Sequence, residues 1–408
     1  MTRRFTTHPV RGFFSTAAVA CALAALALAG CGGGGAGSVM PASPATASPT
    51  PATTAAPGAA LPNYAANVAG TAAWIAADAQ LPDGAIVDSG TQISPYFANR
   101  AAIGLALAGG HTSAVQAWMQ WYIAHLNATD VWGGSGTIYD YTVAGGVETS
   151  TGTADSTDSY AGTFLSLAST FYQTGGSTAQ AYVRSIRAQL AQVASVLTTG
   201  QQTDGLTWAL PTYQIKYLMD NCEVYAGLRD YGTLLAALGD TADAATFAAR
   251  AQASANGISS ELWNASADAY NNAIGVGNVA TPVDWTNYES AAAELFPVLF
   301  GVITPTSSQA VAAYAKFNAA FTKWDALDIP DEYPWTLVST AAILMNDAAR
   351  ANAYIGAVDG AYVATGYPYP WYDAEGGWFV QSNALLAAQT STAGARRVTA
   401  RTRMLVGP

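Results

Sequence analysis

Two pairs of acidic residues stand three positions apart, each beside an apolar stretch. Asp155 and Asp158 lie in ADSTDSYAGTFLSLA, and Asp220 and Glu223 lie in MDNCEVYAG. Residues three apart share one face of a helix, so each pair would present two carboxyl groups toward one point. Neighbouring carboxyls in different environments can divide the work of general acid and general base.

The same acids also suit a structural role. A carboxylate at a helix start accepts hydrogen bonds from free backbone N–H groups and favours the positive end of the helix dipole. Both DSTD and DNCE have the spacing of a capping box. Glu223, however, stands among apolar or small residues, where burial would raise its pKa as a general acid needs. We therefore expect Asp155 and Asp158 both to cap a helix and to take part in chemistry.

The elements that must position these acids are helices. Apolar residues recur at intervals of three and four throughout the body of the chain, and alanine is the commonest filler. No strand-like alternation of useful length lies between the apolar segments. The pattern predicts twelve helices, near 63–79, 94–109, 112–127, 156–174, 178–198, 217–238, 242–262, 287–303, 307–324, 334–346, 350–363 and 377–389.

The connections between these helices alternate in length. Odd-numbered helices are usually followed by long loops rich in Gly, Trp, Tyr and Asp, and even-numbered helices by tight turns such as AGGHT and TGGST. This unit of helix, long loop, helix and short turn occurs six times. It resembles the six-hairpin, or (α/α)6, toroid of many carbohydrate-active enzymes, an all-α fold whose long loops gather at one rim. An open superhelical array is the alternative.

That resemblance implies a rim rich in acids and aromatic residues. The stretch from Ala154 also resembles the A-[ST]-D-x-D-x-x-x-A segment of family 8 glycoside hydrolases, although two residues rather than one separate the aspartates here. The likeness implies that Asp155 or Asp158 contacts substrate, and it places Asp88 where that family's acid stands. Candidate catalytic residues are thus Glu223, Asp155, Asp158, Asp220 and Asp88. The aromatic residues expected to bind sugar are Tyr96, Trp132, Trp208, Tyr217, Trp335, Trp371 and Trp378.

Composition limits the partners. The net charge is −11, and without the three arginines of the first thirty residues it is −14, which disfavours nucleic acids and anionic polymers. With 11 Trp, 21 Tyr and only 11% charged residues, the chain suits neutral sugars. His111, His125 and Cys222 are the only histidines and cysteine of the body, so we expect neither a metal site nor a cofactor.

We therefore predict a glycoside hydrolase acting on a neutral oligo- or polysaccharide, a monomer, with inversion as the outcome that the toroid resemblance implies. Glu223 is the preferred acid, and Asp155 or Asp158 the preferred base. A polysaccharide lyase on the same toroid is a rival, weakened by the few histidines and the negative charge. A surface protein that binds glycans without cutting them is the second rival.

The ends of the chain predict export. Residues 1–30 combine Arg3, Arg4 and Arg11 with a short apolar stretch, as in a signal peptide. LAGC, ending at Cys31, resembles the lipobox of bacterial lipoproteins, and Gly32 after it favours the outer membrane. Residues 31–62, from Cys31 through a Gly-, Ala-, Pro- and Thr-rich linker, read as a lipidated flexible tether. They precede a catalytic domain at 63–389 and a basic, disordered tail at 390–408.

Replacing Cys31 with Ser should release the protein from the membrane, because the lipid is attached to that thiol. Mass spectrometry of wild-type protein and membrane partition of both forms test this. Wild-type protein without acyl mass, together with unchanged partition of the variant, would contradict a lipoprotein.

Overall fold

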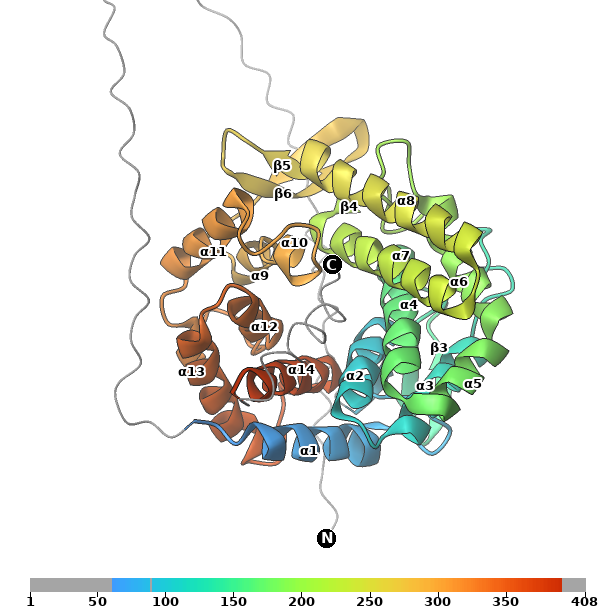
Figure 1. Ribbon diagram of the computed structural model, residues 1–408, viewed down its shortest axis with the longest axis horizontal. Helices are drawn as coiled ribbons and strands as arrows, with labels where there is room; N and C mark the ends of the chain where they lie inside the picture. The colour runs from blue at the N-terminus through green and yellow to red at the C-terminus, as the bar shows by residue number, and fades with distance from the viewer. Residues whose placement is uncertain (1–60, 89, 391–408) are drawn as a thin grey trace, which may run out of the picture. The chain divides into compact units, whose positions relative to one another are not determined.

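The computed structural model describes residues 61–88 and 90–390. The signal segment, Cys31, nearly all of the 31–62 linker and the tail beyond 390 therefore lie outside the described residues. The described helices form six hairpins arranged in a ring (Figure 1). The predicted all-α (α/α)6 toroid is confirmed.

One helix of each hairpin belongs to the inner ring. Consecutive inner helices pack against one another, and the last packs on the first, so that the ring is closed. These helices are mostly buried because they face both the outer helices and the centre. They are α2 (Pro95–Ala108), α4 (Thr157–Thr174), α7 (Leu218–Leu238), α9 (Tyr288–Ala293) continued by α10 (Phe296–Leu299), α12 (Leu337–Leu344) and α14 (Asp373–Thr390).

The other helix of each hairpin lies outside. The outer helices are α1 (Tyr64–Trp74) with η1 (Ile75–Ala79), α3 (Thr112–Ala124), α5 (Gly176–Ser185) with α6 (Arg187–Gly200), α8 (Thr241–Gly257) with η2 (Ile258–Leu262), α11 (Ser308–Ala320) with η4 (Trp324–Ala326), and α13 (Ala348–Val358) with η5 (Asp359–Val363). The described residues thus contain fourteen α-helices rather than twelve. Ile186 interrupts the fifth predicted helix, and a new helix, α10, with Pro297 in its first turn, begins within the eighth.

Two small antiparallel sheets in the long loops were not predicted. Tyr141–Ala144 (β2) pairs with Gln92–Ile93 (β1) and Val147–Ser150 (β3). Ala269–Gly275 (β6) pairs with Lys216–Tyr217 (β4), Trp263–Asn264 (β5) and Val279–Pro282 (β7), the last through the turn η3 (Val276–Asn278). Strand β6 is largely buried on both faces, so its sequence does not alternate and gave no strand signal.

Glycines let neighbouring inner helices approach closely. A methyl group at Gly227 of α7 would lie 2.5 Å from Cα of Gly162 of α4, and one at Gly104 of α2 would lie 2.7 Å from Cα of Gly377 of α14. Side chains four positions apart share a helix face, so residues four before these glycines face the same seams. Those residues are all charged: Arg100, Asp158, Glu223 and Asp373.

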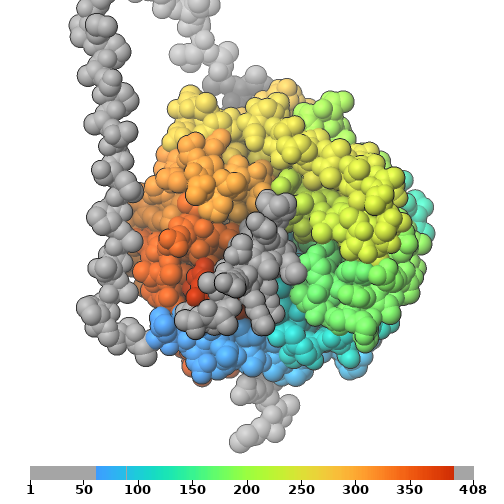
Figure 2. Space-filling view, in the orientation of Figure 1, coloured from blue at the N-terminus to red at the C-terminus, as the bar shows by residue number. Residues whose placement is uncertain are grey.

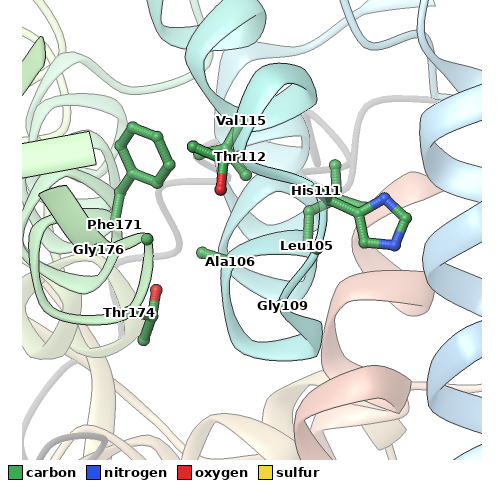
Figure 3. Close-up of a pocket in the computed structure, with 11 residues that line it drawn as sticks. Leu105, Ala106, Gly109, His111, Thr112, Val115, Phe171, Thr174 and Gly176 are labelled. Carbon is green, nitrogen blue, oxygen red and sulfur yellow. The ribbon is translucent and has the colours of Figure 1, made fainter. Parts of the chain in front are cut away.

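The two ends of the ring differ. At the end formed by the short turns, a cavity of about 250 Å³ lies between the C-terminal ends of α2 and α4, lined by Leu105, His111 and Phe171 among others (Figure 3). No carboxyl, lysine or arginine side chain lines it. The charged groups gather at the opposite end instead. None of the described helices has the length and apolar character needed to cross a membrane.

Replacing Gly227 with Ala should lower the free energy of unfolding by about 1–3 kcal/mol, the usual range for overpacking. The methyl group would press on the α4 backbone, and the better helix propensity of Ala offsets only part of that cost. Gly356→Ala is the matched control: it lies on outer helix α13 with no neighbouring atom within 4 Å, and should gain up to about 1 kcal/mol. Chemical denaturation of both variants measures the difference, and equal stabilities would refute the close seam.

Candidate active site

Acidic side chains from all six inner positions meet at the end of the ring where the long loops lie. They come from different helices, but each stands in the first two turns of an inner helix or in the loop before it. Burial raises the pKa of most of them, and the charges of other members of the group add to this for Asp155, Asp220, Glu289 and Asp373. The group comprises Asp88, Asp140, Asp155, Asp158, Asp220, Glu223, Glu289, Asp331, Asp373 and Glu375.

Asp155 is the accessible member of the pair that opens α4. Its side chain is open to solvent, and its carboxyl accepts no hydrogen bond from the described residues. Surrounding protein nevertheless desolvates it, and the charges of Asp140, Asp158 and Glu289 add to this, raising its pKa to about 7. A carboxyl that is reachable and titrates near neutrality can accept a proton from water.

Asp158 has a different environment three residues later. It is buried, its Oδ2 accepts a hydrogen bond from the Thr207 hydroxyl at 2.5 Å, and its Oδ1 accepts one from the Ser159 N–H at 2.8 Å. Burial raises its pKa to about 6 against these hydrogen bonds. Asp158 therefore fastens the start of α4 to the loop that precedes α7.

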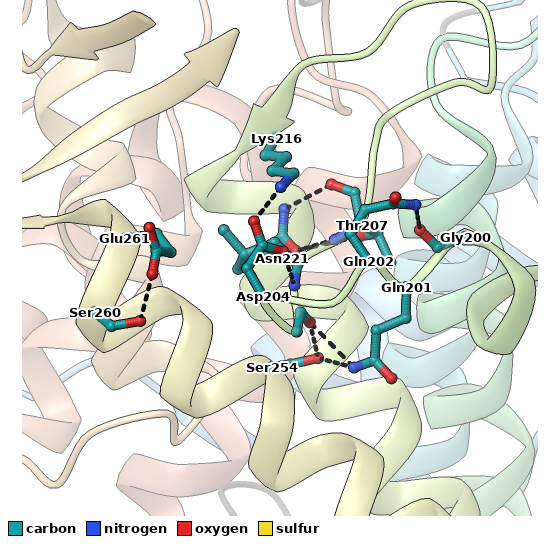
Figure 4. A network of polar contacts seen from close by, with 12 residues as sticks. Gly200, Gln201, Gln202, Asp204, Thr207, Lys216, Asn221, Ser254, Ser260 and Glu261 are labelled. Carbon is teal, nitrogen blue, oxygen red and sulfur yellow. Dashed lines mark hydrogen bonds and ion pairs between the residues drawn. The ribbon is translucent and has the colours of Figure 1, made fainter. Parts of the chain in front are cut away.

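That loop is fixed at several points along its length (Figure 4). The Gln201 side-chain amide donates to the Gly205 carbonyl and to Ser254 Oγ, each at 3.0 Å. Asn221 Oδ1, on α7, accepts from the Thr207 N–H at 2.8 Å. The loop and the strand β4 that ends it therefore hold three aromatic side chains in place: Trp208, Tyr213 and Tyr217.

Glu223 lies inside the ring, where two groups of α2 hold it. Its Oε1 accepts hydrogen bonds from the Tyr96 hydroxyl at 2.8 Å and from Arg100 Nη2 at 3.1 Å. The Arg100 guanidinium carbon lies 4.7 Å from the ring centroid of Phe300 and 4.9 Å from that of Trp378. Burial raises the pKa of Glu223 to about 7 even though Arg100 and Tyr96 favour its ionised form.

Asp220 lies one turn nearer the start of α7 than Glu223. It is buried, and its Oδ2 has no hydrogen-bond partner among the described residues. Burial, followed by the charges of Asp158, Glu223 and Asp155, raises its pKa well above the usual range. The protonated form of Asp220 is therefore favoured, and its Oδ2 faces no donor or acceptor among the described residues.

A third acidic cluster stands at the start of α14. Asp373 is fully buried with Oδ2 unpartnered among the described residues, and the nearby charge of buried Asp88 helps to raise its pKa. Glu375 instead accepts hydrogen bonds from the backbone N–H groups of Trp335 and Thr336, at 3.0 and 2.7 Å. Glu375 thus holds the loop that leads into α12.

The aromatic residues predicted to bind sugar fall into two groups. Tyr96, Trp132, Trp208 and Tyr217 are partly exposed on the loops or helix starts of the acidic end. Trp335, Trp371 and Trp378 are buried. Trp371 packs against Phe379 with ring centroids 5.8 Å apart, and Trp378 packs beneath Arg100. The second group therefore serves the core in this structure, the alternative that is common for tryptophan near a helix end.

A row of aromatic rings that the sequence reasoning missed leads to Glu223. Successive ring centroids lie 6.5, 5.6, 5.0, 5.2 and 6.1 Å apart. Two aromatic-rich sequence segments could have indicated this row: GYPYPWYD, which leads into α14, and SPYF, which begins α2. In order, this aromatic row consists of Tyr369, Tyr333, Tyr372, Phe97, Tyr96 and Tyr160.

Two further observations concern the chemistry available. Within residues 61–88 and 90–390, no three His, Cys, Asp or Glu side chains are arranged to hold a metal ion. Cys222, on α7 between the two acids, is a free thiol that is fully buried, and burial raises its pKa. The thiol is therefore held in its neutral, unreactive form.

Known proteins resemble this chain in structure and not detectably in sequence. It matches no protein-family profile, and no curated protein matches it. A wild-type glycosidase structure shares 15% identity, over 79% of this chain and 96% of that chain, with a TM-score of 0.57. A GH76 α-mannanase from Bacteroides thetaiotaomicron shares 11% identity, over 81% of this chain and 98% of that chain, with a TM-score of 0.53.

A rhamnosidase from Klebsiella oxytoca is similar as well, with 12% identity, 82% of this chain and 65% of that chain covered, and a TM-score of 0.52. At these identities the likeness concerns the fold. The chain has the helical toroid found in several glycosidases.

Proposed function

We propose that this protein is a glycoside hydrolase whose reaction is carried by Asp155 and a carboxyl of α7. The observation that supports this most directly is the contrast between two neighbouring carboxyls. The side chain of Asp155 is open to solvent and its carboxyl accepts no hydrogen bond from the described residues, while Asp220 is buried, its pKa is raised, and its Oδ2 has no partner among those residues. Hydrolysis of a glycosidic bond needs one carboxyl of each kind.

In this mechanism Asp220 donates its proton to the leaving oxygen, and Asp155 takes a proton from the attacking water. Burial, followed by the charges of Asp158, Glu223 and Asp155, raises the pKa of Asp220 and so favours its protonated form before the reaction. Glu223 is the second candidate for the acid, although Arg100 and Tyr96 already occupy its Oε1. We propose inversion at the anomeric carbon, the outcome that the toroid resemblance implies.

The substrate we propose is a neutral oligo- or polysaccharide. Arg100 is paired with Glu223, and the other carboxyls of the group stand at the same end of the ring, in inner helices or in the loops before them. An anionic sugar would be repelled by these carboxyls. The accessible tyrosines and tryptophans of the loops offer the faces on which neutral sugar rings pack.

We also propose that the protein acts outside the cytoplasm, anchored in the bacterial cell envelope by lipid on Cys31. The basis is the sequence of the first 62 residues, with an apolar signal segment, LAGC and an uncharged tether. A flexible tether of that length would let the domain reach polymers in the periplasm or at the cell surface.

Asp155→Asn and Asp220→Asn should lower turnover on the order of a hundredfold or more with little change in melting temperature. If Glu223 is the acid instead, Glu223→Gln shows that loss and Asp220→Asn does not. Asp158→Asn is the matched control, since Asp158 is tied to Thr207. It should cost roughly 0.5–2 kcal/mol of stability and little turnover of the folded fraction.

The measurement is digestion of a glycan panel, with the products identified by mass and their anomers by NMR. Aryl glycosides with good leaving groups should restore activity to the acid variant and leave the Asp155 variant inactive, because water must still be activated. Full activity in all four variants would show that none of these acids takes part in the reaction.

The pH profile of kcat/KM should rise through about pH 7, because Asp155 must be deprotonated to act and its pKa is raised to about 7. The profile should fall at higher pH, where Asp220 loses its proton. Asp140→Asn removes a charge that raises the Asp155 pKa and should shift the rising limb to lower pH. A rising limb centred near pH 4, or one that Asp140→Asn leaves in place, would exclude Asp155 as the base.

A further inference from the structure

Two exposed tyrosines stand on opposite sides of the acidic end. Tyr213 and Tyr369 are each 48% exposed, unusually high for such large apolar rings. Tyr213 lies in the loop before α7, and Tyr369 lies in the loop before α14. These helices are three positions apart in a closed ring of six, so their loops are on opposite sides of the centre.

The first tyrosine adjoins the reacting carboxyls. The Tyr213 hydroxyl lies 3.1 Å from that of Tyr217, and the two ring centroids are 6.5 Å apart. Tyr217 is in turn close enough to Asp220 and Asp155 for their charges to raise its pKa. Tyr213 therefore extends the surface beside Asp155 outward along the α7 side.

The second tyrosine is the outer end of the aromatic row. The row runs from Tyr369 through Tyr333, Tyr372 and Phe97 to Tyr96, whose hydroxyl donates to Glu223 at 2.8 Å. A continuous line of rings thus joins the exposed side chain to the buried carboxyl from the α14 side.

Both tyrosines are held in position before any ligand arrives. Tyr213 is in a tight turn closed by a 3.1 Å hydrogen bond from its N–H to the Leu210 carbonyl, and the ion pair of Lys216 with Asp204 fixes the same loop. The Tyr369 hydroxyl donates to Glu332 Oε2 at 3.2 Å. An anchored ring loses little conformational freedom on binding, so it is a favourable surface for stacking.

We propose that a sugar chain lies across the acidic end with units on both sides of the reacting carboxyls, Tyr213 and Tyr369 being the outer contacts. The enzyme then cuts a polysaccharide at internal bonds. This inference rests on the proposed function and deepens it. An enzyme that trims chain ends needs outer contacts on one side only, whereas here exposed, anchored rings occur on both.

The test compares polymers with short substrates. Wild-type protein, Tyr213→Ala, Tyr369→Ala and the double variant are assayed on yeast α-mannan, barley β-glucan and xylan, on their hexasaccharides, and on aryl monosaccharide glycosides. Each single substitution should lower kcat/KM on the hexasaccharide about two- to tenfold, the range of one stacking contact, and clearly more than on the aryl glycoside. Val311→Ala, 53% exposed on outer helix α11, is the control and should change neither.

Internal cutting also predicts that wild-type protein lowers the viscosity of the polymer well before reducing ends accumulate. Release of only mono- or disaccharides at unchanged viscosity would overturn the proposal, as would tyrosine variants with normal hexasaccharide kinetics. If wild-type protein cuts none of the polymers, the proposed hydrolase function fails. Retardation in gels containing the same polymers then tests two-sided binding alone: loss in both tyrosine variants supports it, and equal retardation refutes it.

Discussion

The close contact of inner helices through glycine is the constraint on which the rest of the molecule depends. At two seams, α2 with α14 and α4 with α7, backbone meets backbone because Gly104, Gly377, Gly162 and Gly227 carry no Cβ. The residues one turn before these glycines face the same seams and are charged. Tight packing therefore both closes the ring and buries Arg100, Asp158, Glu223 and Asp373. Burial raises the pKa of the three carboxyls among them.

Desolvation raises the pKa of Asp155, Asp158, Asp220 and Glu375 alike, yet these carboxyls differ in their hydrogen-bond partners. Asp158 and Glu375 accept hydrogen bonds from neighbouring loops, and each fixes such a loop in place. Within the described part of the chain, the Asp155 carboxyl, at the surface, and Asp220 Oδ2, beneath it, have no such partner. Aspartates at similar helix starts thus differ in role: Asp158 holds a loop through hydrogen bonds, whereas Asp155 and Asp220 are candidates for proton transfer.

This difference explains what the sequence could and could not reveal. The 3.6-residue periodicity and the alternation of loop lengths were enough to place an inner helix at 94–109, where the structure has α2 at Pro95–Ala108. They could not show that Thr207, 49 positions away, would satisfy Asp158, or that Trp371 would be buried while Tyr369 stayed exposed. Burial on both faces likewise concealed β6. Hydrogen bonding and burial at these positions depend on residues that are distant in sequence. The periodicity of a segment contains no information about such residues.

Ring closure also has a consequence for the order in which the chain can be completed. The buried face of α2 is covered by α14, which is the last of the described helices to be synthesised. Until then, the seam at Gly104 is open and Arg100 lacks the Trp378 ring that packs on it. During synthesis from the N-terminus, the apolar face of α2 therefore stays uncovered until nearly the whole domain has been made. The contact between α2 and α14 joins residues far apart in sequence, and such contacts form slowly. The exposed apolar face also makes the incomplete ring prone to aggregate.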